Sequence, residues 1–182
     1  MIASSYPRRP SIRAGLTGLC IATFLGALPV IGQPVERQDS RQAAAAFGEN
    51  IEALIDSLAV ERERVEVRIN RCEGSRGEMR DDVYAVWVGV QLLAENDDAG
   101  QLLAAVADNW RSRGFQVFRD RVLGNGGVNI AATDPATGES YSLDSGFPPY
   151  PQRYIVGYFS TPCLEEPSGA APFGPVVRGS NR

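Results

Sequence analysis

The chain of 182 residues contains no histidine and no lysine, because all 18 of its basic residues are arginine. Without imidazole, neither a Ser-His-Asp triad nor a histidine-ligated zinc site can form from its residues. Without a side-chain amine, Schiff-base chemistry at lysine is excluded as well. The missing residue types exclude several classes of enzyme, whereas no motif in the sequence indicates a particular class. We predict no cofactor and no metal site.

Basic residues are also outnumbered by 22 acidic residues, so the net charge is −4. Every acidic residue follows Gly32, and the part after Gly32 alone carries 15 arginines and a net charge of −7. Proteins that bind nucleic acids or anionic lipids present clusters of basic residues. We therefore expect no nucleic-acid partner, and contact with a membrane only through the N-terminal segment if that segment is not cleaved.

The first 32 residues have the order of segments that is typical of a secretory signal peptide. Arg8, Arg9 and Arg13 precede an uncharged, mostly apolar run over residues 14–28, and a short exit ends at Gly32. A basic, apolar and small-residue order directs a chain across a membrane and is then removed. We predict a signal peptide over residues 1–32 and an exported product, located outside the cell or in the cell envelope.

The same segment has two alternative roles, as a membrane anchor or as a site of lipid attachment. The uncharged stretch of 22 residues that ends at Val35 is long enough to span a bilayer as an uncleaved anchor. Glycines and Pro29 interrupt the stretch, which favours cleavage. Lipid attachment at Cys20 is not expected, because Thr17 and Leu19 stand where a bacterial lipobox has an apolar and a small residue.

Removal of the signal peptide would leave two cysteines, Cys72 and Cys163, in an oxidising compartment. Each follows the end of a predicted strand, and an even number of cysteines in an exported chain favours a disulfide. Two free buried thiols are the alternative. Val67 and Ile69 lie on one face of the predicted strand, and Cys72 is out of step with them. Cys72 would reach that face only through a bulge or a turn at the strand end.

Two segments have the apolar spacing of amphipathic helices. The first begins near Gln42, after Asp39 or Ser40 as the cap, and is expected to end near Arg62 or Arg64. Its apolar stripe consists of Phe47, Ile51, Leu54, Ile55 and Leu58. The second follows residues 96–98 and ends at Gly114, which is suited to a left-handed cap. Its stripe consists of Ala99, Leu102, Leu103, Val106 and Trp110.

Six segments are predicted as strands, because apolar and polar residues alternate in them or β-branched and aromatic residues concentrate there. They are residues 65–71, 82–93, 115–120, 128–133, 139–144 and 152–160. The second is apolar almost throughout, so we expect a central strand that is covered on both faces, at least in part. Trp87 in this strand and Trp110 in the second helix are both expected in the core.

This order of elements predicts an α+β domain of two layers, with a mostly antiparallel sheet of about six strands and both helices on one face. We place the globular domain at residues 41–164. Residues 33–40 are expected to form a linker. Residues 165–182 are rich in Pro, Gly, Ser and Ala and are expected to be a disordered tail.

Three segments follow one another in a familiar order: a helix end that runs into a strand (Trp110 to Val117), a hairpin (Ala132 to Asp144) and a final Pro162-Cys163. Their order resembles small, uncharacterised exported proteins and lipoproteins of actinobacteria, which share a long first helix, an early Cys and a late Pro-Cys. The resemblance covers about residues 42–165. It implies a location in or near the cell envelope, and no activity or catalytic residue.

The best binding candidate in the sequence is the loop rich in proline and aromatic residues that contains Phe147, Tyr150, Arg153 and Tyr154. Prolines stiffen such a loop, and Tyr and Arg are common anchors in interfaces. The alternative is a rigid connection between two strands.

We expect an exported envelope protein that binds a partner protein or a small ligand without catalysing a reaction. A hydrolase that uses carboxylates alone is one alternative, and it would need acids from different segments to face each other across a cleft. An uncleaved, membrane-anchored structural component of the envelope is another.

Overall fold

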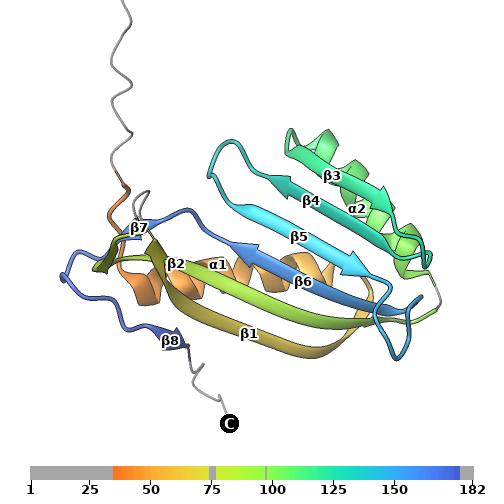
Figure 1. Cartoon of the computed structure of the whole chain (residues 1–182), viewed down its shortest axis with the longest axis horizontal. Helices are drawn as coiled ribbons and strands as arrows, with labels where there is room; N and C mark the ends of the chain where they lie inside the picture. The colour runs from red at the N-terminus through yellow and green to blue at the C-terminus, as the bar shows by residue number, and fades with distance from the viewer. Residues whose placement is uncertain (1–34, 74–76, 97, 177–182) are drawn as a thin grey trace, which may run out of the picture. The chain divides into compact units, whose positions relative to one another are not determined.

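The computed structural model describes residues 35–73, 77–96 and 98–176. The predicted signal peptide lies outside these residues. Helix α1 (Ser40–Asp56) comes first, and helix α2 (Ala99–Ser112) follows two long strands (Figure 1). The strands are β1 (Val60–Glu73), β2 (Met79–Ala94), β3 (Gln116–Val122), β4 (Val128–Thr133), β5 (Ser140–Ser145), β6 (Tyr154–Ser160), β7 (Leu164–Glu165) and β8 (Gly174–Pro175). Among the described residues, no helix is both long and apolar enough to cross a membrane.

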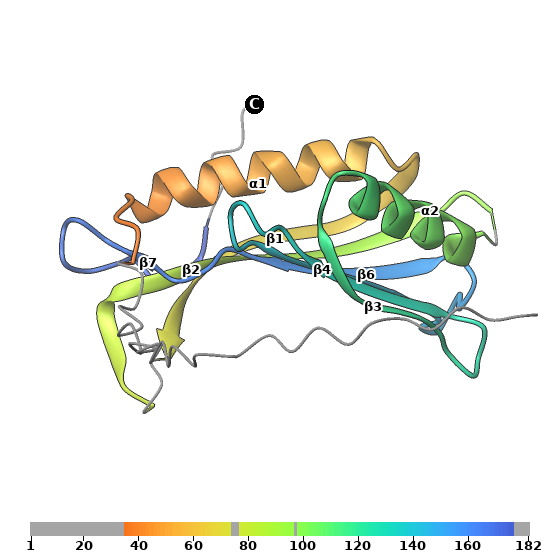
Figure 2. The same cartoon turned by 90° about the horizontal axis from the view of Figure 1, so that it is seen from above.

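The strands form one open sheet in the order β3-β4-β5-β6-β2-β1-β8, and β7 extends the pairing along β2. All of these strand pairs are antiparallel. Helix α1 packs on β1 and β2, whereas α2 packs on β3, β4 and β5. Both helices lie on the same side of the sheet (Figure 2). The predicted α+β class, with two helices on one face of an antiparallel sheet, is therefore confirmed.

The core lies between the helices and this face of the sheet. The predicted helical stripes face inward, and the largest fully buried side chains include Ile51 and Ile55 of α1 and Leu103 and Trp110 of α2. Asp39 caps α1, because its Oδ1 accepts hydrogen bonds from the backbone N–H groups of Arg41 and Gln42 at 3.0 and 2.9 Å.

The first helix ends at Asp56, so the prediction that it continues to Arg62 or Arg64 is wrong. Ala59 adopts a φ of 49°, which turns the chain, and β1 begins at Val60. The first residues of β1 pair with the last residues of β2, with Val60 opposite Ala94. The residues from Val60 onwards, which the local pattern assigned to the helix, therefore belong to a strand because of their pairing with a distant segment.

The second helix ends in a Schellman motif, in which the last helical carbonyls are satisfied by two backbone N–H groups beyond the helix. The N–H of Gly114, at a φ of 86°, donates to Arg111 O at 3.0 Å, and the N–H of Phe115 donates to Trp110 O at 3.0 Å. The rings of Trp110 and Phe115 stack with centroids 6.4 Å apart. The predicted glycine cap is confirmed.

Cys72 and Cys163 form the predicted disulfide, with Cα atoms 6.0 Å apart. The register of β1 against β2 shifts between Arg71 and Glu73, so Cys72 lies in a bulge. The extra residue changes the alternation of the strand, and Cys72 is buried although it is out of step with Ile69.

Residues 165–176 of the tail expected to be disordered are ordered, and residues 177–182 lie outside the described residues. Strand β7 pairs with Val83 and Tyr84 of β2, and β8 pairs with Arg68 and Ile69 of β1. These two short strands bring the sheet to eight strands instead of about six. The correction has a physical cause: edge positions of the sheet accept backbone pairing whatever the composition of the added segment.

The expected linker is likewise part of the domain, at least from Val35 onwards. The N–H of Gln38 donates to Glu165 O at 3.0 Å, and the N–H of Glu165 donates to Glu36 O at 2.8 Å. The hydroxyl of Tyr84 donates to Gln38 O at 2.9 Å. The segment before α1 is therefore held between β7 and the core.

The carboxylate of Glu166 joins the start of α1 to the C-terminal segment. Glu166 is 3% exposed, and its Oε2 accepts the backbone N–H of Ser40 at 2.8 Å. Its Oε1 accepts the backbone N–H and the hydroxyl of Ser168 at 3.1 and 3.0 Å. These bonds keep the pKa of this buried carboxyl at about 2, below its ordinary value of 4.5.

Strand β2 is central, as predicted, but the helices cover only one of its faces. Val86, Val88 and Val90 face the core and are buried. Trp87 is half-buried on the opposite face, so its prediction as a core residue is corrected, whereas Trp110 is 1% exposed. The sequence does not reveal which residues of β2 point inward, because the outward-facing Trp87 is as apolar as the inward-facing valines on either side of it.

Gly157 in β6 leaves space for two core side chains on the neighbouring strands. A Cβ at this position would lie 2.6 Å from Cγ2 of Val90 and 2.8 Å from Cδ2 of Leu143. We expect Gly157→Ala to lower the free energy of unfolding by about 1–3 kcal/mol, the cost of overpacking a core. Gly124→Ala is the matched control, because its Cβ would meet nothing within 4 Å. Urea unfolding measures both variants, and equal stability would contradict the prediction.

Candidate ligand-binding cleft

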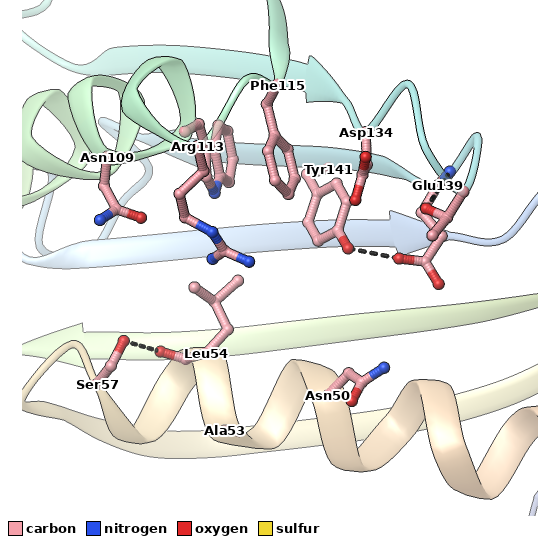
Figure 3. A pocket seen from close by; sticks show the side chains of 12 residues that line it. Asn50, Ala53, Leu54, Ser57, Asn109, Arg113, Phe115, Asp134, Glu139 and Tyr141 are labelled. Atoms are coloured by element: carbon pink, nitrogen blue, oxygen red, sulfur yellow. Dashed lines mark hydrogen bonds between the residues drawn. The ribbon is translucent and has the colours of Figure 1, made fainter.

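A cleft of about 550 Å³ lies between the two helices, beside the hairpin that joins β4 to β5 (Figure 3). Its lining consists of Asn50, Ala53, Leu54, Ser57, Asn109, Trp110, Arg113, Phe115, Asp134, Thr137, Glu139 and Tyr141. The volume falls within the range of about 300–1,000 Å³ that is usual for small-molecule sites.

One wall of the cleft comes from the last turns of α1. Asn50, Leu54 and Ser57 follow one another at the spacing that places side chains on one side of a helix. The Ser57 hydroxyl donates to Leu54 O at 2.6 Å. This wall therefore presents an amide and an apolar side chain to the cleft.

The end of α2 provides the opposite wall. The Schellman motif turns the chain at Gly114, so that Asn109, Trp110 and Arg113 precede the turn and Phe115 follows it. The guanidinium of Arg113 lies over the ring of Phe115, with Cζ 5.2 Å from the ring centroid. A single helix ending thus positions a cation, an amide and two aromatic rings.

Aromatic rings continue along this wall into the sheet. The centroid of Tyr141 in β5 lies 5.8 Å from that of Trp110 and 5.3 Å from that of Phe115. Tyr141 also contacts Phe159 of β6, edge to face, at 5.8 Å. The cluster connects the cleft to the core and gives the wall a rigid apolar surface.

The turn between β4 and β5 contributes the acidic residues of the cleft. Asp134 N–H donates to Glu139 O at 2.9 Å, and Asp134 Oδ1 accepts the N–H of Ala136 at 2.8 Å. Gly138 completes the turn at a φ of 74°. The predicted hairpin is confirmed, and it places both carboxylates at the same end of the cleft.

Tyr141 and Glu139 form a hydrogen-bonded pair within the cleft. The Tyr141 hydroxyl donates to Glu139 Oε2 at 2.6 Å. Burial, and then this bond to a carboxylate, raise the pKa of Tyr141 above its ordinary value of 10.0. Tyr141 therefore stays protonated at neutral pH and keeps the carboxylate of Glu139 in place.

The lining carries two carboxylates and one guanidinium, together with amide and hydroxyl groups. Figure 3 shows Asp134 and Glu139 at one end of the cleft and Asn109 at the other, with Arg113 and Tyr141 between them. Such an arrangement can bind a flat, partly apolar ligand with a positive or hydrogen-bond-donating group at one end. In the part of the chain that the structure describes, no group of three metal-ligating side chains comes together.

The four predicted binding residues, Phe147, Tyr150, Arg153 and Tyr154, lie outside this cleft. Phe147 and Tyr150 are 42% and 54% exposed, on the loop before β6. Arg153 Nε donates to Ala94 O at 2.9 Å, which fastens the loop to the end of β2. Tyr154 begins β6 and is half-buried. This loop thus has the features of a rigid connection between strands, and its binding role stays a prediction.

Comparisons of this chain with models of protein families, with curated proteins and with solved structures found no match. The resemblance to exported actinobacterial proteins stays a prediction. Seven residues of the cleft belong to the helix end and the hairpin on which this resemblance is based.

Proposed function

We propose that this chain is an exported domain of the cell envelope that binds a small ligand in the cleft between its helices. One observation carries the proposal: a cleft of suitable volume combines an aromatic wall with hydrogen-bonding and charged groups on three separate elements. The disulfide between Cys72 and Cys163 is consistent with an oxidising compartment. The basic and apolar order of the first 32 residues supports export.

The charges of the cleft indicate the class of ligand. Asp134 and Glu139 outnumber Arg113, so the acidic end favours a positively charged or NH-rich group. The rings of Phe115 and Tyr141 offer a surface for an aromatic or other flat apolar body. We therefore propose a small amine with an aromatic ring as the simplest ligand that uses both features.

A carboxylate-dependent hydrolase is less well supported by the same geometry. The two carboxylates come from the ends of one turn instead of from facing segments. Asp134 is engaged in capping that turn, and Glu139 accepts the Tyr141 hydroxyl. Both carboxylates have a part in maintaining the local structure, which favours binding over catalysis.

Titration of phenethylamine into the ¹⁵N-labelled protein tests the cleft. We expect chemical-shift changes at the amides of Asn109, Phe115 and Tyr141, because these residues line the proposed site. Glu139→Gln is expected to weaken the affinity about fivefold, the effect of losing roughly 1 kcal/mol of charge attraction. Glu61→Gln is the matched control, because Glu61 is exposed on β1.

An equal response to phenylacetate, which has the same ring with the opposite charge, would contradict the proposed ligand class. Shift changes that map to the loop with Phe147 and Tyr150 would instead favour that loop as the site. Release of nitrophenol from nitrophenyl glycosides by the wild type, and its loss in Glu139→Gln, would favour the hydrolase.

A further inference from the structure

The face of the sheet opposite the helices carries a regular row of side chains. The register places Arg119, Ala131, Ser142, Tyr158, Gly89 and Glu66 opposite one another in turn, from β3 to β1. Residues directly opposite one another in antiparallel strands lie on the same face. The row crosses five inter-strand spacings, about 24 Å in all. We call the surface made by this row and the two rows beside it the open face.

Two aromatic rings lie at the centre of the open face. The centroids of Trp87 and Tyr158 are 5.9 Å apart, and Tyr158 is 48% exposed. A Cβ on Gly89 would come within 2.8 Å of Cζ3 and 2.9 Å of Cζ2 of Trp87, so the indole lies over the glycine. The six-membered ring of Trp87 therefore reaches over Gly89, and the side chain is half-buried.

Hollows flank these two rings on both sides. One of about 130 Å³ lies toward β1, and one of about 220 Å³ lies toward β3. Trp87 and Tyr158 line both hollows. Polar side chains surround the rings, among them Gln91 in the first hollow and Ser142 in the second. The rings thus form the middle of one continuous surface.

The charge of the open face is opposite to that of the chain. Its three rows hold four arginines (Arg64, Arg68, Arg119 and Arg121) and two carboxylates (Glu66 and Asp144), whereas the chain has a net charge of −4. On β1, two arginines share one acid, because both Arg64 and Arg68 donate to Glu66, at 2.6 and 2.8 Å.

The other two arginines lie on β3 at the far side of the face. Arg119 and Arg121 are exposed, and within the described residues neither forms an ion pair. One carboxylate of the face, Asp144, lies near both arginines: burial raises its pKa, whereas the charges of Arg119 and Arg121 lower it. Two guanidinium groups thus face one carboxylate, so positive charge is in excess on this side of the aromatic rings.

We infer that the open face binds an acidic polysaccharide that lies across the strands. Sugar rings have apolar C–H faces that pack on Trp87 and Tyr158, and their hydroxyl groups suit Ser142 and Gln91. Carboxylates on the polymer complement Arg119 and Arg121. The length of the row lets several sugar units bind at once.

Two other occupants fit the charge of this face less well. The N-terminal segment of the chain carries Arg8, Arg9 and Arg13 and would be repelled by the arginines of β3. Single-stranded nucleic acid also combines stacking rings with negative charge. The disulfide is consistent with an oxidising compartment, which favours an extracellular polysaccharide over an intracellular nucleic acid.

Binding of hexagalacturonate to the full chain, followed by calorimetry and by tryptophan fluorescence, tests the inference. Maltohexaose is the neutral probe of equal length, and a six-nucleotide thymidine oligomer is the competing polyanion. We expect hexagalacturonate to bind at least about tenfold more tightly than either. Its affinity should fall with ionic strength, because exposed charges are screened by salt.

Three variants locate the site. Arg119→Ala combined with Arg121→Ala is expected to lower the affinity about tenfold and to reduce its dependence on salt. Tyr158→Ala removes one ring, and Gly89→Ala displaces the Trp87 ring, so each should weaken binding. Arg41→Ala is the control, because Arg41 is an exposed arginine on α1, on the opposite side of the sheet.

A thermal melt of each variant separates loss of binding from loss of folding, and the exposed Arg119 and Arg121 can be removed without opening the core. Equal binding of maltohexaose, preference for the thymidine oligomer, or an unchanged affinity in the arginine double variant would overturn the inference. Concentration-dependent dimerisation that hexagalacturonate does not reverse would also overturn it, because a second copy would then occupy the face.

Discussion

Replacing both Cys72 and Cys163 by alanine is expected to lower the free energy of unfolding by about 4 kcal/mol. The disulfide joins residues 91 positions apart, so its loss releases a long loop in the unfolded chain. For a domain of this size the melting temperature should fall by about 8–16 °C. Urea unfolding and calorimetry of the oxidised wild type and the double variant measure the change.

Reduction of the wild type with dithiothreitol should reproduce the loss, and it should not destabilise the double variant further. Cys20→Ala in the same full-length chain is the matched control, because Cys20 is the cysteine outside the disulfide. A double variant as stable as the oxidised wild type would show that the bond contributes no stability.

Glu166→Gln is expected to cost about 2–3 kcal/mol at pH 7, the value of hydrogen bonds to a buried charged group. The carboxylate accepts hydrogen bonds from Ser40 and Ser168, and an amide of the same shape cannot accept all of them. Glu49→Gln, on an exposed position of α1, is the control and should leave stability unchanged.

The same bonds predict a dependence on pH. The pKa of Glu166 is about 2 in the folded protein and near 4.5 in the unfolded chain. The unfolded chain therefore binds more protons between these values, and stability is lost as the pH falls from 4.5 toward 2. The wild type should lose its advantage over Glu166→Gln across this window, and a constant difference would contradict the assignment.

The local signals in the sequence predicted those parts of the fold that depend on nearby residues. The stripe that ends at Trp110, the Gly114 stop and the turn before Glu139 each have a short-range cause, namely helical periodicity, a left-handed cap and a tight turn. The disulfide was predicted from the number of cysteines, and the bulge at Cys72 explains how the strand accommodates it.

Long-range pairing explains what the sequence did not reveal. The composition of the C-terminal segment indicates disorder, yet Glu166 is bound to Ser40, 126 positions away. The early end of α1 has the same origin, because Val60 pairs with Ala94. No pattern within one segment carries information about these partners.

The cleft, like the long-range strand pairs, could not be predicted from local patterns in the sequence. Trp110, Phe115 and Tyr141 all lie in segments to which the sequence drew attention, but as structural features and not as parts of a site. Their association requires α2 to pack on β5, which local periodicity does not predict. The loop with Tyr150 is the binding prediction because its prolines, tyrosines and arginine can be recognised in the sequence without knowledge of packing.

The bond between Cys72 and Cys163 encloses β2, α2 and β3 to β6, and so most of the sheet, within one covalent ring. A protease that cuts the chain once inside this ring, for example in the turn at Gly138, produces a nicked protein whose two pieces remain attached. The two pieces stay joined until a reductant breaks the disulfide. In the oxidising compartment that we propose for this chain, a single cut would therefore not release a fragment.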